Sequence, residues 1–227
     1  MFTIPRRCAI ASLVLLGTTA AALAQPAAPP VAGDVDLNGS RVYIFVGKTG
    51  LGHNHAIVGR LQAGRVRLDT AEQAGLLVFD MRTFVADTAD ARKVVGLEGE
   101  TDPGTQKQVT DNMLGPDVLD VARHPTAAFE IRSAVRSPRP PAGPNPLYDL
   151  TGVFTLHGVA RTMVIPVEAS AAGNQVVLRG SFPIRQTDFG MKPYKKLGGV
   201  VGVADELTIM GDIRVAAAPA TPPGPQP

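Results

Sequence analysis

The stretch VARTMVIPVEASAAGNQVVLRGSFPIR, residues 159–185, carries the pattern that decides the fold. It contains two alternating runs, and each run places every second residue on one face. These faces are formed by Val159, Arg161, Met163, Ile165 and Val167 in the first run, and by Val176, Leu178, Gly180, Phe182 and Ile184 in the second. Side chains alternate between the two faces of a β-strand, so a period of two predicts strands with one buried face.

The same period recurs along most of the chain. Alternating runs occupy residues 65–69, 129–135 and 203–215, and further strand-like runs occupy residues 41–47, 75–81 and 147–156. Together these segments make a set of about eight strands. Many short strands separated by turn residues are typical of a β-barrel or a β-sandwich.

One segment departs from this period. Between residues 105 and 120, the apolar residues Val109, Met113 and Leu114 recur at helical spacing, which predicts one amphipathic helix that ends at Gly115. The fold class is therefore all-β with one short helix. The helix is expected either to cover a barrel end or to pack on the outside of a sheet.

The ends of the chain differ from the middle in composition. Residues 1–24 combine two arginines with an apolar run ending in Ala-Leu-Ala, which is the pattern of a secretory signal peptide. We expect a flexible lead-in over residues 25–40, the folded domain over 41–215 and a disordered Pro/Ala-rich tail over 216–227. The Pro-rich residues 137–146 suit an interdomain linker or a long loop between strands, and we favour the loop because neither flank looks complete by itself.

Cysteine content and charge narrow the class of protein. Cys8 is the only cysteine and lies in the expected signal peptide, so the mature chain must be stabilised by its core without disulfides. Removal of Arg6 and Arg7 leaves 20 basic and 20 acidic residues. This balance gives no overall attraction to nucleic acid or to an anionic membrane, although it does not forbid a local basic patch.

The catalytic signatures tested are missing from the sequence, and one polar cluster remains. G-x-S-x-G, H-E-x-x-H and C-x-x-C do not occur, so the usual hydrolase elbow and these zinc and redox patterns are excluded. In Gly52-His53-Asn54-His55, the two histidines would share one face of an extended segment and could begin a metal site. His124, His157 or an aspartate could complete it. Alternatively, these side chains only form hydrogen bonds that hold a turn.

From about residue 41 to 215, the order of segments resembles the YceI-like family of exported polyisoprenoid-binding proteins. The likeness rests on MLGPDVLD (113–120) with the following RHP (123–125), on LTGVFTLHGV (150–159) and on QTDFG (186–190). The resemblance implies an antiparallel lipocalin-like β-barrel with an apolar tunnel for an isoprenoid chain, such as a quinone tail or polyprenyl phosphate. It also implies a periplasmic location, no enzyme activity and a possible homodimer.

An isoprenoid tail offers no directional groups, so its site needs apolar walls and length. The candidate wall residues are the larger apolar ones on inward faces and on the helix: Phe79, Phe84, Met113, Leu114, Leu119, Phe129, Phe154, Leu156, Phe182 and Phe189. Each could equally belong to a solid core, because a small barrel is often filled by its own side chains. The leading hypothesis is an exported binding protein for an isoprenoid lipid. The alternatives are a metal-binding module built on His53 and His55, and a partner of a membrane respiratory or envelope protein.

Overall fold

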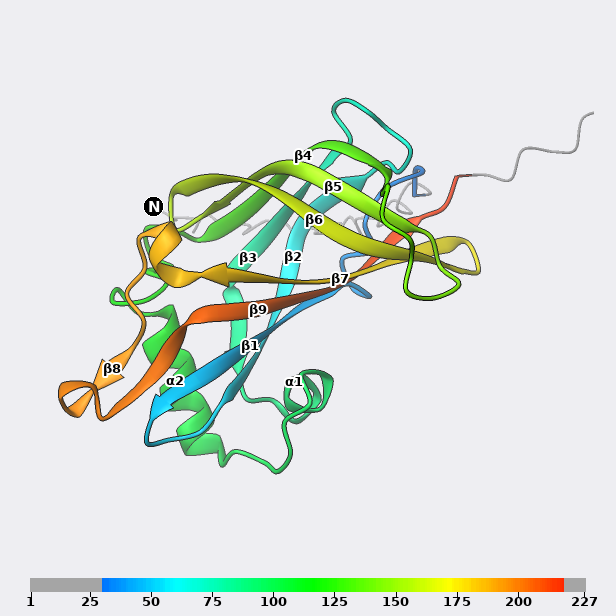
Figure 1. The fold of residues 1–227 in the computed structure, drawn as a ribbon. Coiled ribbons are helices and arrows are strands. Elements are labelled where there is room, and N and C mark those ends of the chain that lie inside the picture. Colours follow the sequence, from blue (N-terminus) through cyan, green and yellow to red (C-terminus); the bar gives the residue numbers. More distant parts are fainter. Residues whose placement is uncertain (1–29, 219–227) are drawn as a thin grey trace, which may run out of the picture.

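The computed structural model describes residues 30–218, which form one antiparallel sheet closed into a barrel (Figure 1). Strands β1 to β7 pair in chain order, β7 pairs with β9, and β9 pairs with β1 to close the barrel. The strands are β1 (Arg41–Gly50), β2 (His55–Val66), β3 (Gly75–Ala86), β4 (Thr126–Arg136), β5 (Leu147–Leu156), β6 (Val159–Ala172), β7 (Gln175–Arg185), the two-residue β8 (Lys195–Lys196) and β9 (Val201–Ala216). The expected all-β barrel of about eight strands is confirmed.

The alternation in the sequence corresponds to the two faces of the barrel wall. On β7, the residues that face the interior are Leu178, Gly180, Phe182 and Ile184, in the register that the period of two predicts. Ile209 and Ile213 of β9 likewise point inward and are buried. Apolar burial on this inner face is the main force that closes the sheet, since the residues between these positions meet solvent.

Strand β2 differs most from the sequence-based expectation. Only Arg65 and Val66 of the expected strand 65–69 belong to it, and β2 extends back to His55. Glycines interrupt the alternation in this strand. Gly59 is required there because a Cβ would lie 2.3 Å from the Phe84 ring, so the glycine that hides the pattern also leaves room for that ring to pack against β2.

Two α-helices are present among the described residues, where one was expected. Helix α2 (Pro103–Leu114) is the expected helix, with Asp102 as its N-cap and Gly115 directly after its last residue. Helix α1 (Ala89–Val94) was not expected, and its N-cap Thr88 accepts a hydrogen bond from the Ala91 N–H. Two short 3₁₀ helices, η1 (Gln186–Phe189) and η2 (Leu197–Gly199), flank β8. Neither α-helix within residues 30–218 has the length and apolarity needed to cross a bilayer.

The segments outside the expected domain are partly ordered. Asp34 and Val35 bridge to Arg65 and Val215, so the lead-in expected over residues 25–40 joins the barrel several residues earlier than its composition suggests. Ala216 pairs with Gln175, and the barrel therefore includes the first residue of the expected tail. Residues 137–146 connect the paired strands β4 and β5 as a loop. The expected signal peptide, residues 1–24, lies outside the described residues.

Candidate functional site

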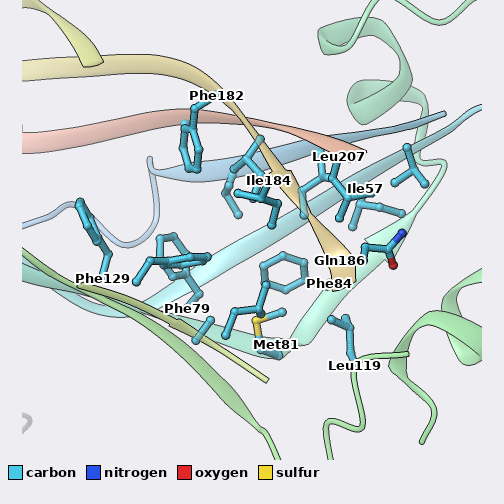
Figure 2. Close-up of a pocket in the computed structure, with 18 of the residues that line it drawn as sticks. Ile57, Phe79, Met81, Phe84, Leu119, Phe129, Phe182, Ile184, Gln186 and Leu207 are labelled. Atoms are coloured by element: carbon cyan, nitrogen blue, oxygen red, sulfur yellow. The ribbon is translucent and has the colours of Figure 1, made fainter. Parts of the chain in front are cut away.

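The barrel encloses an elongated apolar cavity of about 220 Å³. Its walls come from all eight long strands and from α2, and side chains from opposite walls point toward one another (Figure 2). An apolar cavity of about 150 Å³ is already large enough to admit benzene. The barrel is therefore hollow, which settles a question that the period of two leaves open.

The cavity is long as well as apolar. Along β9 alone, the residues that line it run from Val203 to Ile213. A strand rises about 3.3 Å per residue, so the regularly paired part from Leu207 to Ile213 alone spans about 20 Å, and the lining continues beyond it to Val203. A narrow space of this length suits a linear apolar molecule better than a compact one.

A pair of glycines explains part of the hollow. Gly180 of β7 lies directly opposite Gly211 of β9, and both line the cavity. A Cβ on Gly211 would meet only Ile213, at 3.7 Å, whereas a Cβ on Gly180 would lie 2.7 Å from the carbonyl oxygen of Pro166. Space is thus available beside Gly211, while Gly180 allows the close approach of β6.

Eight of the ten apolar residues expected to form the wall lie in it. These are Phe79, Phe84, Met113, Leu119, Phe129, Phe154, Leu156 and Phe182. Met113 belongs to α2, which also contributes Val109 and Asn112, so the helix covers the interior. Leu119 lies in the turn that follows α2, and Figure 2 shows its side chain pointing toward the strands.

The other two residues belong to the surrounding packing. Phe189 is buried and meets the Phe154 ring edge-on, with ring centroids 5.6 Å apart, but it does not reach the cavity. Leu114 packs against the core from the end of α2. Phe154 also meets Phe79 and Phe129 edge-on, so this ring joins the wall to the layer behind it.

Few polar side chains interrupt the apolar lining. They are His55, Asn112, Gln186 and Tyr194. The amide nitrogen of Gln186 donates a hydrogen bond to the Ala204 carbonyl oxygen at 2.7 Å, which fixes this buried side chain in the wall. Such scattered polar groups can orient one end of a ligand, while the apolar wall supplies most of the contact.

His55 belongs to a buried polar cluster at the start of β2. Its Nδ1 lies 2.7 Å from the Oδ2 of Asp87, and Asp87 also accepts hydrogen bonds from the Ala56 N–H at 2.9 Å and from Arg92 at 3.4 Å. The Asp87 side chain is fully buried. Arg92 is itself held by the carbonyl oxygens of Glu98 and Gly99, so α1 and the loop after it bring a cation to this carboxylate.

Burial alone would raise the pKa of Asp87, but the hydrogen bonds from His55 and Ala56 and the charges nearby outweigh it, and the pKa is lowered. Asp87 is therefore ionised at neutral pH. An ionised partner requires a proton on the Nδ1 of His55, the ring nitrogen that faces Asp87.

His53 and His55 lie close to each other, as expected, and a carboxylate lies beside them as a third potential ligand. His53 and His55 have ring centroids 4.5 Å apart, and ligand atoms of His53, His55 and Asp87 all lie within 4.8 Å of one another. His124 and His157 instead form a separate pair, with ring centroids 4.4 Å apart and the rings tilted by 49°. Of the possible additional ligands, the aspartate is therefore the one that joins His53 and His55.

Several residues of the site were not predicted from the sequence. Asp87 and Arg92 follow β3, and no local pattern marks Asp87 as the partner of a histidine 32 residues earlier or Arg92 as the partner of Asp87. Gly211 was also missed, although glycine at an inward position of an alternating strand is a signal that space is needed there.

Comparisons with known proteins agree with this architecture. The family model described as YceI-like domain matches residues 34–215. The crystal structure of Burkholderia cenocepacia BcnA aligns with a TM-score of 0.54 at 22% identity, covering 81% of this chain and 100% of that chain. A structure from Saccharophagus degradans, described as a polyisoprenoid binding domain implicated in plant cell wall breakdown, aligns with a TM-score of 0.51 at 12% identity, covering 82% of this chain and 99% of that chain.

No curated protein matches the sequence significantly. At these identities the two structures show a shared fold. The family match covers nearly the whole barrel, from the first bridge at Asp34 to the last inward residue of β9, Val215. The chain belongs to the YceI-like family.

Proposed function

We propose that this protein is an exported carrier that sequesters one long isoprenoid lipid, a quinone or a polyprenyl phosphate, in the barrel interior. The observation that carries the proposal is the long apolar cavity, whose lining runs from Val203 to Ile213 along β9. The solved neighbour described as a polyisoprenoid binding domain supports the ligand class. The protein acts by binding and needs no catalytic group.

The physical chemistry of the wall favours such a ligand. An isoprenoid tail gains about 0.8 kcal/mol for each buried carbon, so each five-carbon unit can contribute about 4 kcal/mol before entropic costs. The affinity for the ligand then depends on the length of its buried isoprenoid tail. His55, Gln186 and Tyr194 provide the few polar contacts for a quinone ring or a phosphate.

Export is part of the proposal because the proposed ligand is a membrane lipid, which an exported carrier would meet at the membrane surface. A carrier in the periplasm can shield such a chain from water between membranes. The basic and apolar pattern of residues 1–24 supports this location.

The test is native mass spectrometry of protein purified gently from a periplasmic fraction, followed by organic extraction and lipid analysis. We expect a mature chain without residues 1–24 that carries one isoprenoid mass. A full-length chain in the cytoplasmic fraction would contradict export. Failure to form an adduct after incubation with a long-chain ubiquinone or undecaprenyl phosphate in detergent would contradict the carrier function.

A second candidate function is divalent metal binding by His53, His55 and Asp87. The specific observation is the proximity of two imidazoles and one buried carboxylate. Two histidines and a carboxylate form a common ligand set for zinc, copper and iron. A metal ion that displaces the proton shared by His55 and Asp87 would be held by all three side chains, and the half-exposed His53 can turn to complete the set.

Metal analysis of dialysed protein incubated with zinc or copper tests this function. We expect about one bound ion in the wild type and its loss in His53→Ala and in His55→Ala. His124→Ala, from the separate histidine pair, is the matched control and should retain the ion. If the wild type retains no metal, the cluster serves only to hold the start of β2. A homodimer and docking on a membrane respiratory or envelope protein stay predictions.

A further inference from the structure

One end of the barrel carries a projecting tip, which we define as residues 48–52 and 192–202. The tip consists of the end of β1 with the turn after it, and of the hairpin formed by β8 and the start of β9. In Figure 1 this hairpin extends beyond the body of the barrel. The two parts are joined, since the Leu51 N–H donates to the Val200 carbonyl oxygen at 2.9 Å and Leu51 bridges to Val201.

Large apolar side chains point into solvent from this tip. Leu197 is 70% exposed, Leu51 is 67% exposed and Val200 is 51% exposed, and these include the two most exposed leucines within the described chain. They come from both joined parts and lie around one bridge. Exposed apolar side chains that are grouped on a projecting hairpin indicate an interaction site, whereas apolar residues scattered singly over a surface do not.

The charge of the tip is of one sign. It contains Lys48, Lys192, Lys195 and Lys196, all exposed, and no aspartate or glutamate. None of the ion pairs formed within residues 30–218 involves these four lysines. The chain as a whole is nearly neutral, so this local excess of positive charge is a feature of the tip itself.

Backbone geometry holds Leu197 at the apex. Its φ is 51°, in the left-handed region that bulky residues rarely adopt. Pairing of Lys195 with Gly202 and of Lys196 with Val201 closes the hairpin around it. The hairpin thus presents a leucine at a position where glycine or asparagine would suit the backbone better.

We propose that this tip docks the protein on an anionic phospholipid bilayer. Leu51, Leu197 and Val200 enter the boundary between headgroups and acyl chains, and the lysines contact the phosphates. Apolar side chains flanked by lysines are the combination that binds the interface of anionic membranes. The negative surface of such a membrane complements a tip without acidic residues, whereas a neutral bilayer offers only the apolar contacts and no net attraction to the lysines.

The tip adjoins the cavity. Tyr194, which lines the cavity, directly precedes Lys195, and its carbonyl oxygen accepts a hydrogen bond from the N–H of Val203, another lining residue, at 3.0 Å. Docking by this tip would bring this end of the cavity to the bilayer. The docking itself does not depend on the identity of the cargo.

Co-sedimentation with vesicles tests the proposal. We expect the mature protein to bind vesicles of equal parts phosphatidylglycerol and phosphatidylcholine, to bind phosphatidylcholine alone much more weakly, and to be released by high salt. Leu197→Asn removes the apical side chain and suits the positive φ, so this variant should fold at least as well and bind roughly tenfold more weakly. Lys195→Ser with Lys196→Ser should weaken binding roughly 20-fold.

Matched controls are Val164→Thr, at an apolar residue 54% exposed on β6, and Lys93→Ser, at an exposed lysine on α1. Both should bind vesicles like the wild type. Wild-type protein that ignores anionic vesicles, or Leu197→Asn protein that binds them fully, would overturn the proposal, and so would capture of a membrane protein without any binding to bare lipid. Leu197→Asn should still form the 1:1 isoprenoid adduct in detergent, which separates failure of docking from failure of the carrier function.

Discussion

Filling the cavity at Gly211 should stabilise the protein and abolish its lipid binding. In Gly211→Val, the new Cβ meets only Ile213, at an ordinary contact distance of 3.7 Å, and the side chain enters the hollow. Burial of three carbons contributes about 2 kcal/mol, and the loss of a glycine from the unfolded chain adds about 0.5 kcal/mol. For a domain of this size, such a gain raises Tm by about 5–10 °C.

The same side chain takes the place of lipid. Displacement of one isoprene unit removes up to about 4 kcal/mol of binding energy, which is close to a thousandfold in Kd. Thermal unfolding and native mass spectrometry with a long-chain ubiquinone measure the two effects on the same preparation. Ser181→Val, on the outward face one residue from Gly180, is the matched control and should bind normally.

Gly180→Val provides the opposite case within the same pair. Its Cβ would lie 2.7 Å from the Pro166 carbonyl oxygen, so this variant should lose about 1–3 kcal/mol of stability. A Gly211→Val protein that is less stable than the wild type, or that binds ubiquinone as tightly, would refute the view that a hollow beside Gly211 holds the ligand.

The remaining predictions concern stability and are measured by urea unfolding. Phe154→Ala should cost about 3–5 kcal/mol, because this ring contacts three others at the wall; a loss below about 1 kcal/mol would show that the wall is loosely packed. Asp87→Ala should cost about 3–5 kcal/mol by leaving Arg92 unpaired, and an unchanged midpoint would disprove that role. Because the Asp87 pKa is lowered, the carboxylate contributes fully to the free energy of unfolding above the ordinary carboxyl pKa of 3.8, and this contribution disappears only in stronger acid. The free energies of unfolding of wild type and Asp87→Ala should therefore converge in strong acid and not at neutral pH. Thr88→Ala should cost about 1 kcal/mol because it removes the hydrogen bond that caps α1. Thr49→Ala, at an exposed threonine outside any helix, is the control and should cost less.

Much of the barrel could be predicted from the sequence because its signal is local. On β7, four successive inward positions, from Leu178 to Ile184, alternate as a strand in a barrel wall requires. Strand β2 was harder, since Gly59 serves a contact with Phe84 that the local sequence does not reveal. Helix α1 spans only six residues, which is too short for a helical period to be visible.

The site was predictable in composition but not in arrangement. Large inward apolar residues such as Phe182 belong to the wall, yet the same pattern is compatible with a solid core, and only the packing shows that space remains beside Gly211. The partner of His55 could not be found from spacing, because Asp87 lies 32 residues away and meets it through the pairing of β2 with β3. Contacts of that range depend on the register of the sheet.

The most direct test of the central claim is a crystal structure of the protein grown with a long-chain ubiquinone. We expect one continuous chain of density inside the barrel, passing across the inner face of the wall at Gly180 and Gly211 and reaching toward Tyr194. Density for the lipid only on the outer surface, or a cavity closed by the rings of Phe79 and Phe182, would contradict the claim that this barrel is a container for an isoprenoid chain.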